Sequence, residues 1–257
     1  MRLLAVAATA VALATPAGYV QSQQRADGGF GDAQISAWAT LGLVAAGADT
    51  GRAAAFLAAQ RPATDTDAAL IALARAAAGD RPDDLLSRLR AHTPGKLVNA
   101  TIWTVIALRQ AGEPVPKTHV SALLRAQRPD GGWPWLRGGA ADSNDTAAAL
   151  QALRAAGVRG KPIERGVAFL RRHQNRDGGF ELSEGRGSDT QSTAWAIQGL
   201  LAAGKQPGVA AFRYLQRMRR ADGSYRYSAR YVTTPLWVTA QVLPALARKP
   251  FPLRGGR

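Results

Sequence analysis

The sequence predicts an all-α protein, an α6/α6 barrel (toroid) built from six helix-hairpin repeats. Helical segments that are apolar on nearly every side alternate with shorter amphipathic ones, as expected for buried and solvent-facing helices. Each buried segment begins with polar residues that can cap free N–H groups. A glycine follows five of these segments, a residue typical of helix ends: Gly47, Gly79, Gly112, Gly157 and Gly204. Six such pairs stack into a solenoid or a ring, and a closed double-layered ring leaves no terminal repeat unprotected.

Composition agrees with this prediction. The 257 residues are 46% hydrophobic, enough for one sizeable core in a single domain. Alanine, leucine and arginine dominate, and such residues lose little side-chain freedom in a helix. No sustained alternation of Val, Ile or Thr predicts a strand.

Inner and outer helices are distinguished by where their charges lie. The expected inner helices lie within 33–47, 65–79, 98–112, 142–157, 188–204 and 233–247. The expected outer helices lie near 17–24, 50–60, 82–92, 116–127, 162–174 and 208–220, several with proline at their start and Arg or Lys on one face. Closure of the ring requires the first outer helix to pack near the last inner helix.

The two ends of the chain differ from the repeats. Residues 1–17 resemble a secretory signal peptide, with Arg2, an apolar stretch to Ala14 and small residues at the cleavage position. This predicts a secreted or periplasmic protein; in the alternative, residues 3–14 begin the first outer helix. The barrel domain is expected to span 18–248, and residues 249–257 are expected to form a disordered tail.

The net charge and the absence of cysteine limit which partners and metal sites the sequence predicts. The net charge is +15, but arginines are scattered over many helices, which does not predict specific binding of nucleic acid. Anionic envelope polymers are the expected neighbours of an exported basic surface. No segment after the leader is long enough to predict a transmembrane helix. There is no cysteine, so disulfides and thiolate zinc sites are excluded, and we predict no cofactor and no metal site.

A short phrase recurs between outer and inner segments. It contains Gln, Asp, Gly and an aromatic residue in fixed order and predicts a tight turn pinned to the core. Its copies are Gln24-Arg-Ala-Asp27-Gly28-Gly29-Phe30, Gln127-Arg-Pro-Asp130-Gly131-Gly132-Trp133, Gln174-Asn-Arg-Asp177-Gly178-Gly179-Phe180 and a worn Arg219-Arg-Ala-Asp222-Gly223-Ser224-Tyr225.

This phrase resembles the Gln-Trp motif of squalene–hopene and oxidosqualene cyclases, which also occurs in the β-subunits of protein prenyltransferases. The resemblance extends over nearly all of residues 17–247. It implies the barrel of the terpenoid cyclase and prenyltransferase superfamily, in which the motif braces the barrel from outside. The resemblance therefore bears on architecture more than on chemistry.

The first turns of the inner helices are expected to meet at one mouth of the barrel. Four tryptophans occupy one equivalent position of the inner repeats, below this polar rim, and together they predict a pocket for a bulky, largely apolar ligand. The predicted ligand-binding residues are Asp32, Gln34, Trp38, Trp103, Asn144, Asp145, Gln191, Trp195 and Trp237. In the structural alternative, each Asp caps its own helix and each indole packs against the next helix.

One stretch of this rim, Asp142-Ser143-Asn144-Asp145-Thr146-Ala147, looks like the acid motif of terpene cyclases that begin by protonation. In that family the middle Asp donates the proton, and here Asn144 holds its place; an amide is no strong acid. The catalytic candidates are therefore limited to Asp142, Asp145 and Asp189. A protein prenyltransferase would need a cysteine ligand to zinc, which the chain lacks, and its three histidines fall on outer helices or their ends.

Two functions from different classes remain. The favoured one is a binding module whose central cavity holds an isoprenoid, a lipid or a cobalamin-like ligand without turnover. The cobalamin-carrying domain of intrinsic factor and transcobalamin is a similar single barrel. The alternative is a terpene cyclase or prenyltransferase-like enzyme acting on an isoprenoid. Asn144 and the single barrel, where the resembled cyclases use two, weigh against catalysis.

Overall fold

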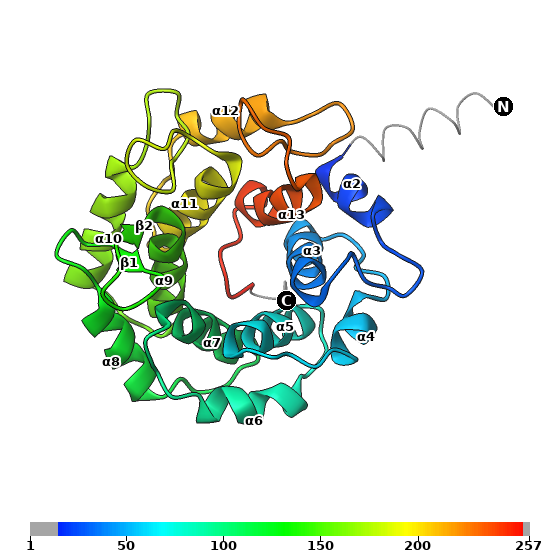
Figure 1. Cartoon of the computed structure of the whole chain (residues 1–257), viewed down its shortest axis with the longest axis horizontal. Helices are drawn as coiled ribbons and strands as arrows, with labels where there is room; N and C mark the ends of the chain where they lie inside the picture. Colours follow the sequence, from blue (N-terminus) through cyan, green and yellow to red (C-terminus); the bar gives the residue numbers. More distant parts are fainter. Residues whose placement is uncertain (1–14, 254–257) are drawn as a thin grey trace.

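Six inner helices and six outer helices form a closed double ring in the computed structural model, which describes residues 15–253 (Figure 1). The inner helices are α3 (Ala33–Ala46), α5 (Asp65–Ala77), α7 (Val98–Gln110), α9 (Ser143–Ala155), α11 (Thr190–Ala202) and α13 (Pro235–Leu246). The outer helices are α2 (Pro16–Ser22), α4 (Ala53–Ala58), α6 (Asp83–Ala91), α8 (Lys117–Ala126), α10 (Lys161–Arg172) and α12 (Val209–Met218). The predicted α6/α6 barrel is confirmed.

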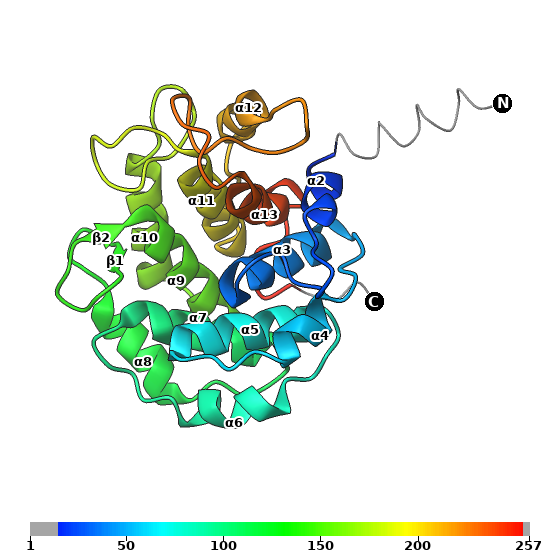
Figure 2. The same ribbon diagram turned by 45° about the vertical axis from the view of Figure 1, so that its right-hand side comes forward.

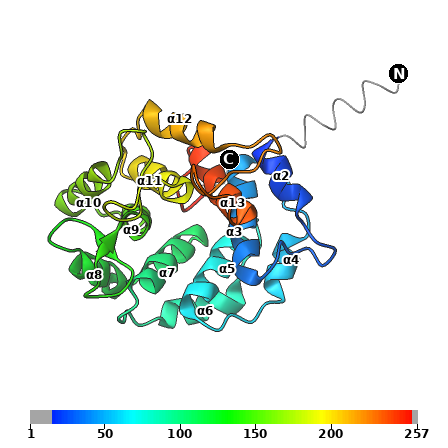
Figure 3. The same ribbon diagram turned by 45° about the horizontal axis from the view of Figure 1, so that its top comes forward.

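Each inner helix packs against its neighbours in the ring, and α13 packs extensively against α3, which closes the circle. The inner helices are buried on nearly all sides, whereas each outer helix buries one face. In α10, for example, Ile163, Phe169 and Leu170 point inward while Arg171 and Arg172 remain outside. Figures 2 and 3 show the outer helices surrounding the inner ring from two further directions.

Five inner helices end at the predicted glycines, all with positive φ, which a residue with a Cβ adopts at a cost. In the first repeat, the amide of Ala48 donates to the carbonyl of Leu43 at 2.9 Å across the glycine. The sixth inner helix ends in the same way, since Lys249 N–H donates to Pro244 O at 3.0 Å. There, however, the left-handed residue is Arg248, with φ 53°.

The recurring phrase forms a turn that joins an outer helix to the next inner helix. In the copy before α9, the Asp130 carboxylate accepts from Gly132 N–H at 2.9 Å, and Gln127 Nε2 donates to Gly131 O at 2.8 Å and to Pro162 O at 2.9 Å. The last contact joins the turn to the start of α10. The phrase is therefore structural, as expected.

A short antiparallel ribbon departs from the purely helical expectation. Strand β1 (Trp133–Pro134) pairs with β2 (Ala141–Asp142) directly before α9. The ribbon follows the aromatic residue of the turn phrase, and the hydroxyl of Thr146 in α9 accepts from Trp133 N–H at 2.9 Å. It fixes Asp142 at the start of α9. A period-2 sequence pattern cannot reveal two strands of two residues each.

The two chain ends also differ from expectation. Helix α2 already begins at Pro16, capped by Thr15, so the barrel starts two residues before the expected boundary. The proposed leader otherwise falls on residues 1–14, which lie outside the described residues. The tail was expected to be disordered, and for residues 249–253 this is wrong, because they enter the ring and bury Phe251 and Leu253. Residues 254–257 are not described.

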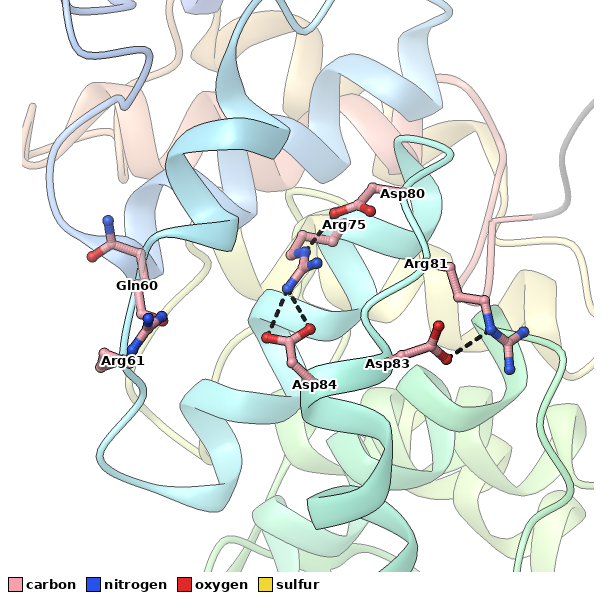
Figure 4. A network of polar contacts seen from close by, with 7 residues as sticks. All are labelled: Gln60, Arg61, Arg75, Asp80, Arg81, Asp83 and Asp84. Carbon is pink, nitrogen blue, oxygen red and sulfur yellow. Dashed lines mark hydrogen bonds and ion pairs between the residues drawn. The ribbon is translucent and has the colours of Figure 1, made fainter.

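Ion pairs connect inner and outer helices at the exterior. Arg75, in the last turn of α5, is buried and pairs with Asp80 at 2.6 Å and Asp84 at 2.8 Å (Figure 4). Beside it, Arg81 pairs with Asp83 at 2.8 Å. A buried guanidinium is tolerated only with such partners. These pairs hold α5 against the start of α6.

Between residues 15 and 253, no helix combines the length and the apolar character needed to cross a bilayer.

Candidate functional site

Three of the predicted rim carboxylates cap their own helices. Asp32, Asp142 and Asp189 each precede an inner helix and accept a hydrogen bond from the backbone N–H three residues later, at 2.9, 2.8 and 2.7 Å. Asp189 also accepts from the Ser192 hydroxyl at 2.7 Å. Capping satisfies N–H groups that have no partner within the helix. The structural alternative therefore describes these three residues.

Asp145 is different, because it lies inside the first turn of α9 and is buried. Its Oδ1 accepts a hydrogen bond of 2.6 Å from Asn99 Nδ2 on the neighbouring α7. Burial raises the pKa of Asp145 well above its ordinary value, and the nearby charge of Asp142 raises it further. The Asn99 contact acts in the opposite direction but does not overcome them.

Asp142 and Asp145 therefore behave as an unequal pair of carboxyls. Burial raises the pKa of Asp142 too, but its hydrogen bonds from the backbone of Asn144 and Asp145 favour the anion. Asp145 receives no backbone N–H of this kind, and a hydrogen bond with Asp142 favours its protonated form. Of the two carboxyls, Asp145 is therefore the one whose pKa is raised further.

A matching contact occurs in the first repeats. Gln34 in α3 donates to the Asp67 carboxylate in α5 at 3.2 Å, as Asn99 in α7 donates to Asp145 in α9. In both cases an amide on one inner helix binds a carboxyl on the next. Asp67 is only half-buried and also accepts from the Thr64 hydroxyl at 2.7 Å. Of the two carboxyls, only Asp145 is buried.

Asn144 and Gln191 occupy the first turns of α9 and α11 and are half-buried. Asn144 stands next to Asp145 in the chain. The Ser143 hydroxyl donates to Asn144 Oδ1 at 3.5 Å, a long and weak contact. These amides add neutral hydrogen-bonding groups to the rim.

The four predicted tryptophans converge inside the ring. The ring of Trp38 lies 5.2 Å from Trp103, 5.4 Å from Trp195 and 6.4 Å from Trp237, centroid to centroid, each pair edge to face. Trp103 and Trp195 are 5.5 Å apart. This is the arrangement that aromatic quadrupoles favour. The inward convergence of the indoles is confirmed.

The indoles form a packed cluster rather than the walls of a wide chamber. Trp38, Trp103 and Trp195 are each no more than 5% exposed. Trp195 Nε1 donates to Gln241 Oε1 on α13 at 3.1 Å, which satisfies its polar group inside the core. The expectation that all four indoles line an open cavity is therefore incorrect for these three, because they fill the axis by contacting one another.

The sequence-based interpretation missed the C-terminal strap, which we define as residues 249–253. Phe251 lies 6.3 to 6.5 Å from the rings of Trp38, Trp103 and Trp195 and closes the cluster from one side. Its backbone N–H donates to Gln151 Oε1 at 2.7 Å, and Gln110 Nε2 donates to Leu253 O at 2.9 Å. The available signal was a short apolar run, Pro-Phe-Pro-Leu, within a basic tail.

These parts give the interior a definite chemical character. A buried carboxyl with a raised pKa lies in the first turn of α9, and Asn99, which donates to it, precedes Trp103 by one turn of α7. A neutral carboxylic acid can donate a proton, and indole faces stabilise nearby positive charge. The arrangement thus suits protonation of an apolar substrate that then carries a cation.

The histidines lie on outer helices or their ends, as expected. His173, which follows α10, interacts electrostatically with Asp142 and opposes the rise in pKa that burial gives to that carboxyl. His92 follows α6 and its Nδ1 is 2.9 Å from an oxygen of Asp65. His119 is buried in α8, 5.4 Å from the His92 ring. Burial, and then the charge of His92, lower the pKa of His119 to about 4.

We expect this histidine to make the fold acid-sensitive. The folded protein keeps His119 neutral, whereas the unfolded chain binds a proton below about pH 6.5, so stability falls as the pH drops from 6.5 towards 4. At about 1.4 kcal/mol per pKa unit, the loss at pH 4.5 is on the order of 2–3 kcal/mol. Urea unfolding at pH 7 and 4.5 should show that His119→Leu reduces this loss. An equal loss in the variant would contradict the assignment.

Comparisons with known proteins were consistent with this geometry. Residues 93–253 match the family described as the squalene-hopene cyclase C-terminal domain. No curated protein matches the chain at the level of sequence.

Solved structures match over most of the chain. A protein from Actinoplanes is 19% identical with a TM-score of 0.68, covering 93% of this chain and 99% of that one. The type II terpene cyclase MstE from Scytonema, as a variant in complex with its substrate geranylgeranyl dihydroxybenzoate, is 16% identical with a TM-score of 0.65; 93% of this chain and 95% of that chain are covered. At these identities the structures are evidence for the same fold.

Proposed function

The chain belongs to the squalene-hopene cyclase C-terminal domain family, and from this premise we propose that it is a type II terpene cyclase acting on an isoprenoid. In such a reaction an acid adds a proton to a carbon–carbon double bond, and the resulting cation is attacked by further double bonds of the same molecule. The reaction ends when the last cation loses a proton or captures water.

The observation that carries this proposal is the burial of Asp145 beside Asp142, which raises the pKa of the Asp145 carboxyl well above its ordinary value. An initiating acid must be protonated at working pH and shielded from water, and burial beside a second carboxyl favours both conditions. Asp142 takes the part of the companion carboxylate, because the backbone N–H groups of Asn144 and Asp145 favour its anionic form. Asn99 orients the acid through the 2.6 Å contact.

The tryptophan cluster supports the later steps. Indole is the aromatic ring that binds cations most strongly, by about 2 kcal/mol or more when water is excluded. Trp38, Trp103 and Trp195 lie in a region that is almost fully shielded from solvent. We propose that the substrate cation forms against this cluster, with movement of the indoles or of the strap making room for the chain of the isoprenoid.

The comparisons favour this enzymatic alternative over the non-catalytic carrier that the sequence favoured. One reason for preferring a carrier was that the resembled cyclases use two barrels. MstE, however, is a type II terpene cyclase with a bound isoprenoid substrate, and this single barrel matches 95% of its chain. The number of barrels therefore no longer weighs against catalysis.

The other reason for preferring a carrier was Asn144, which stands where the resembled acid motif has its proton-donating Asp. In this chain burial raises the pKa of its neighbour Asp145 well above the ordinary value. We therefore assign the acid to Asp145 and treat Asn144 as a neutral group of the rim.

Turnover in heavy water tests the proposal. The purified protein is incubated with geranylgeranyl dihydroxybenzoate, geranylgeraniol and squalene, in H2O and in D2O, and the products are separated by chromatography and their masses measured. Cyclisation by proton addition and proton loss gives an isomer of the substrate in H2O. The same product formed in D2O should carry one deuterium at the carbon that was protonated.

Heat-denatured protein is the control for acid-catalysed cyclisation in solution. A product that carries one deuterium and requires folded protein supports the proposal. Absence of product from all three substrates, or a product formed equally by denatured protein, would count against it. If the protein retains an unchanged isoprenoid through gel filtration and forms no product, the result supports the carrier function instead.

A further inference from the structure

A cavity opens at the end of the barrel opposite Asp145, among the C-terminal ends of the inner helices. It has a volume of about 670 Å³ and lies between α7, α9, α11 and the strap. Four cationic side chains contribute to its wall: Arg109, Arg154, Arg248 and Lys249. Gln110 and Gln151 add amides, and no carboxylate side chain lines it. The proposed cyclase function does not use this cavity.

These four cations differ from other arginines of the barrel. Arg75, also in the last turn of an inner helix, is neutralised by two carboxylates (Figure 4). Within residues 15–253, none of the four lining cations has a carboxylate within ion-pair distance. Arg109 donates to the backbone oxygen of Glu113, whose carboxylate instead binds Arg81 and Arg90. The positive charge of the cavity is thus unneutralised by side chains.

Helix ends at this mouth reduce the positive field without cancelling it. Three helix C-termini each contribute roughly −0.5 of a charge, about −1.5 together, against four full positive charges. Arg154 binds two of the carbonyls, donating to Val158 O at 2.8 Å and Ala202 O at 3.2 Å. A net excess of roughly two to three charges remains, which corresponds to a compact anion with two or more negative charges.

Arg248 provides the second, independent observation. It takes the left-handed position, φ 53°, that glycine holds in the five other repeats. A residue with a side chain is strained in that conformation, so Arg248 lowers the stability of the fold. A strained residue at this position indicates that its side chain has a role of its own. The guanidinium lies over Phe212, with its central carbon 4.7 Å from the ring centre. This contact supports the side chain, and a guanidinium can offer several N–H groups to a multidentate acceptor.

We propose that this mouth binds a phosphate or diphosphate group through Arg248, Lys249, Arg109 and Arg154. Arginine forks match the oxygens of phosphate, and lysine adds a point charge. The group comes either from a free anion or from an organic phosphate whose hydrocarbon part contacts the apolar side of the cavity, formed by Leu201, Phe251 and Pro252. Because Lys249 and Phe251 belong to the strap, a bound anion also holds the strap in place.

Calorimetric titration with inorganic diphosphate tests this site directly. The wild-type protein should bind it at a single site, with affinity that falls as salt rises. Arg248→Gly should weaken binding at least tenfold, while the melting temperature without ligand stays equal or rises, because glycine suits the left-handed position. Opposite effects on binding and stability separate a binding role from a structural one.

Matched lysine variants provide the control. Lys205 follows the glycine that ends α11, as Lys249 follows Arg248, but it does not line the cavity. Lys249→Ala should weaken diphosphate binding about tenfold and Lys205→Ala less than twofold. Equal weakening by both would show an unspecific charge effect and overturn the proposal. Absence of binding by the wild type, or undiminished binding by Arg248→Gly, would also overturn it.

The two sources of the anion are separated by comparing inorganic diphosphate, geranyl diphosphate and geraniol. Equal affinity for the two diphosphates identifies a free anion, and at least tenfold tighter binding of geranyl diphosphate identifies an organic phosphate. Both results support the site. If geraniol binds as well as geranyl diphosphate and Arg248→Gly changes neither, the site does not recognise phosphate. These binding measurements are independent of turnover.

Discussion

Asp145→Asn is expected to remove cyclisation activity while leaving the fold at least as stable as the wild type at neutral pH. Asparagine keeps the shape of the side chain and an oxygen that can accept the hydrogen bond from Asn99. It cannot donate a proton as an acid. Loss of a general acid costs about 10²- to 10⁴-fold in rate.

The expected gain in stability follows from the raised pKa of Asp145. Between the unfolded and folded pKa values, the folded protein binds a proton that the unfolded chain lacks, so the wild type loses stability as the pH rises through this window. The amide of the Asp145→Asn variant does not titrate. His119 favours the folded state at pH 8 over pH 5 in both proteins, so the contribution of Asp145 appears in the difference between them. From pH 5 to pH 8, the melting temperature of Asp145→Asn should therefore rise more, or fall less, than that of the wild type.

Asp67→Asn is the matched control, because Asp67 makes the equivalent contact with Gln34 in another repeat but is half-buried. Its turnover should stay within about twofold of the wild type. Product formation by Asp145→Asn at the wild-type rate would refute the assignment of the acid. A parallel loss in both variants would indicate a general effect of the rim charge.

Trp38→Ala is expected to give the largest loss of stability of any single change in the barrel axis. Trp38 contacts three other indoles and Phe251, and it is almost completely buried. Truncation of a buried aromatic residue to alanine costs about 3–5 kcal/mol, because the transfer energy and the packing of the new cavity are both lost. For a domain of this size, the melting temperature should fall by about 6–20 °C.

Trp135→Ala provides the control for loss of an indole. Trp135 lies in the loop between β1 and β2 and is 53% exposed. Its removal should change the free energy of unfolding by no more than about 0.5 kcal/mol. Urea unfolding followed by far-ultraviolet circular dichroism measures both variants without relying on indole fluorescence. A loss below about 1 kcal/mol for Trp38→Ala would mean that the cluster contributes little to the core.

The two ends of the barrel have different chemical characters. Asp145 lies where the inner helices begin, and the cationic cavity lies where they end. The tryptophan cluster and the strap separate them. The proposed proton chemistry at one mouth and the proposed anion binding at the other should therefore be separable. We expect each to be removed by a variant that leaves the other intact.

The amino-acid sequence by itself determined the repeated architecture. Helix periodicity, the glycine that ends five of the six inner helices and the Gln-Asp-Gly-aromatic turn are local properties, because each acts within a few residues of the chain. Counting from these glycines also aligned four tryptophans on one face, which was sufficient to predict their convergence. Helix capping is local as well. The sequence offered capping as the structural alternative for the rim carboxylates, and the structure shows it for Asp32, Asp142 and Asp189.

Only the tertiary structure decided which of these residues has unusual chemistry. The raised pKa of Asp145 depends on burial and on the nearby charge of Asp142. The carboxyl is held by Asn99, 46 residues away in the chain, and the strap reaches Gln151 across 100 residues. The cationic cavity likewise combines three helix ends with the segment after α13. A pKa and a cavity arise from groups brought together by ring closure, and local sequence patterns contain no information on which distant side chains will meet.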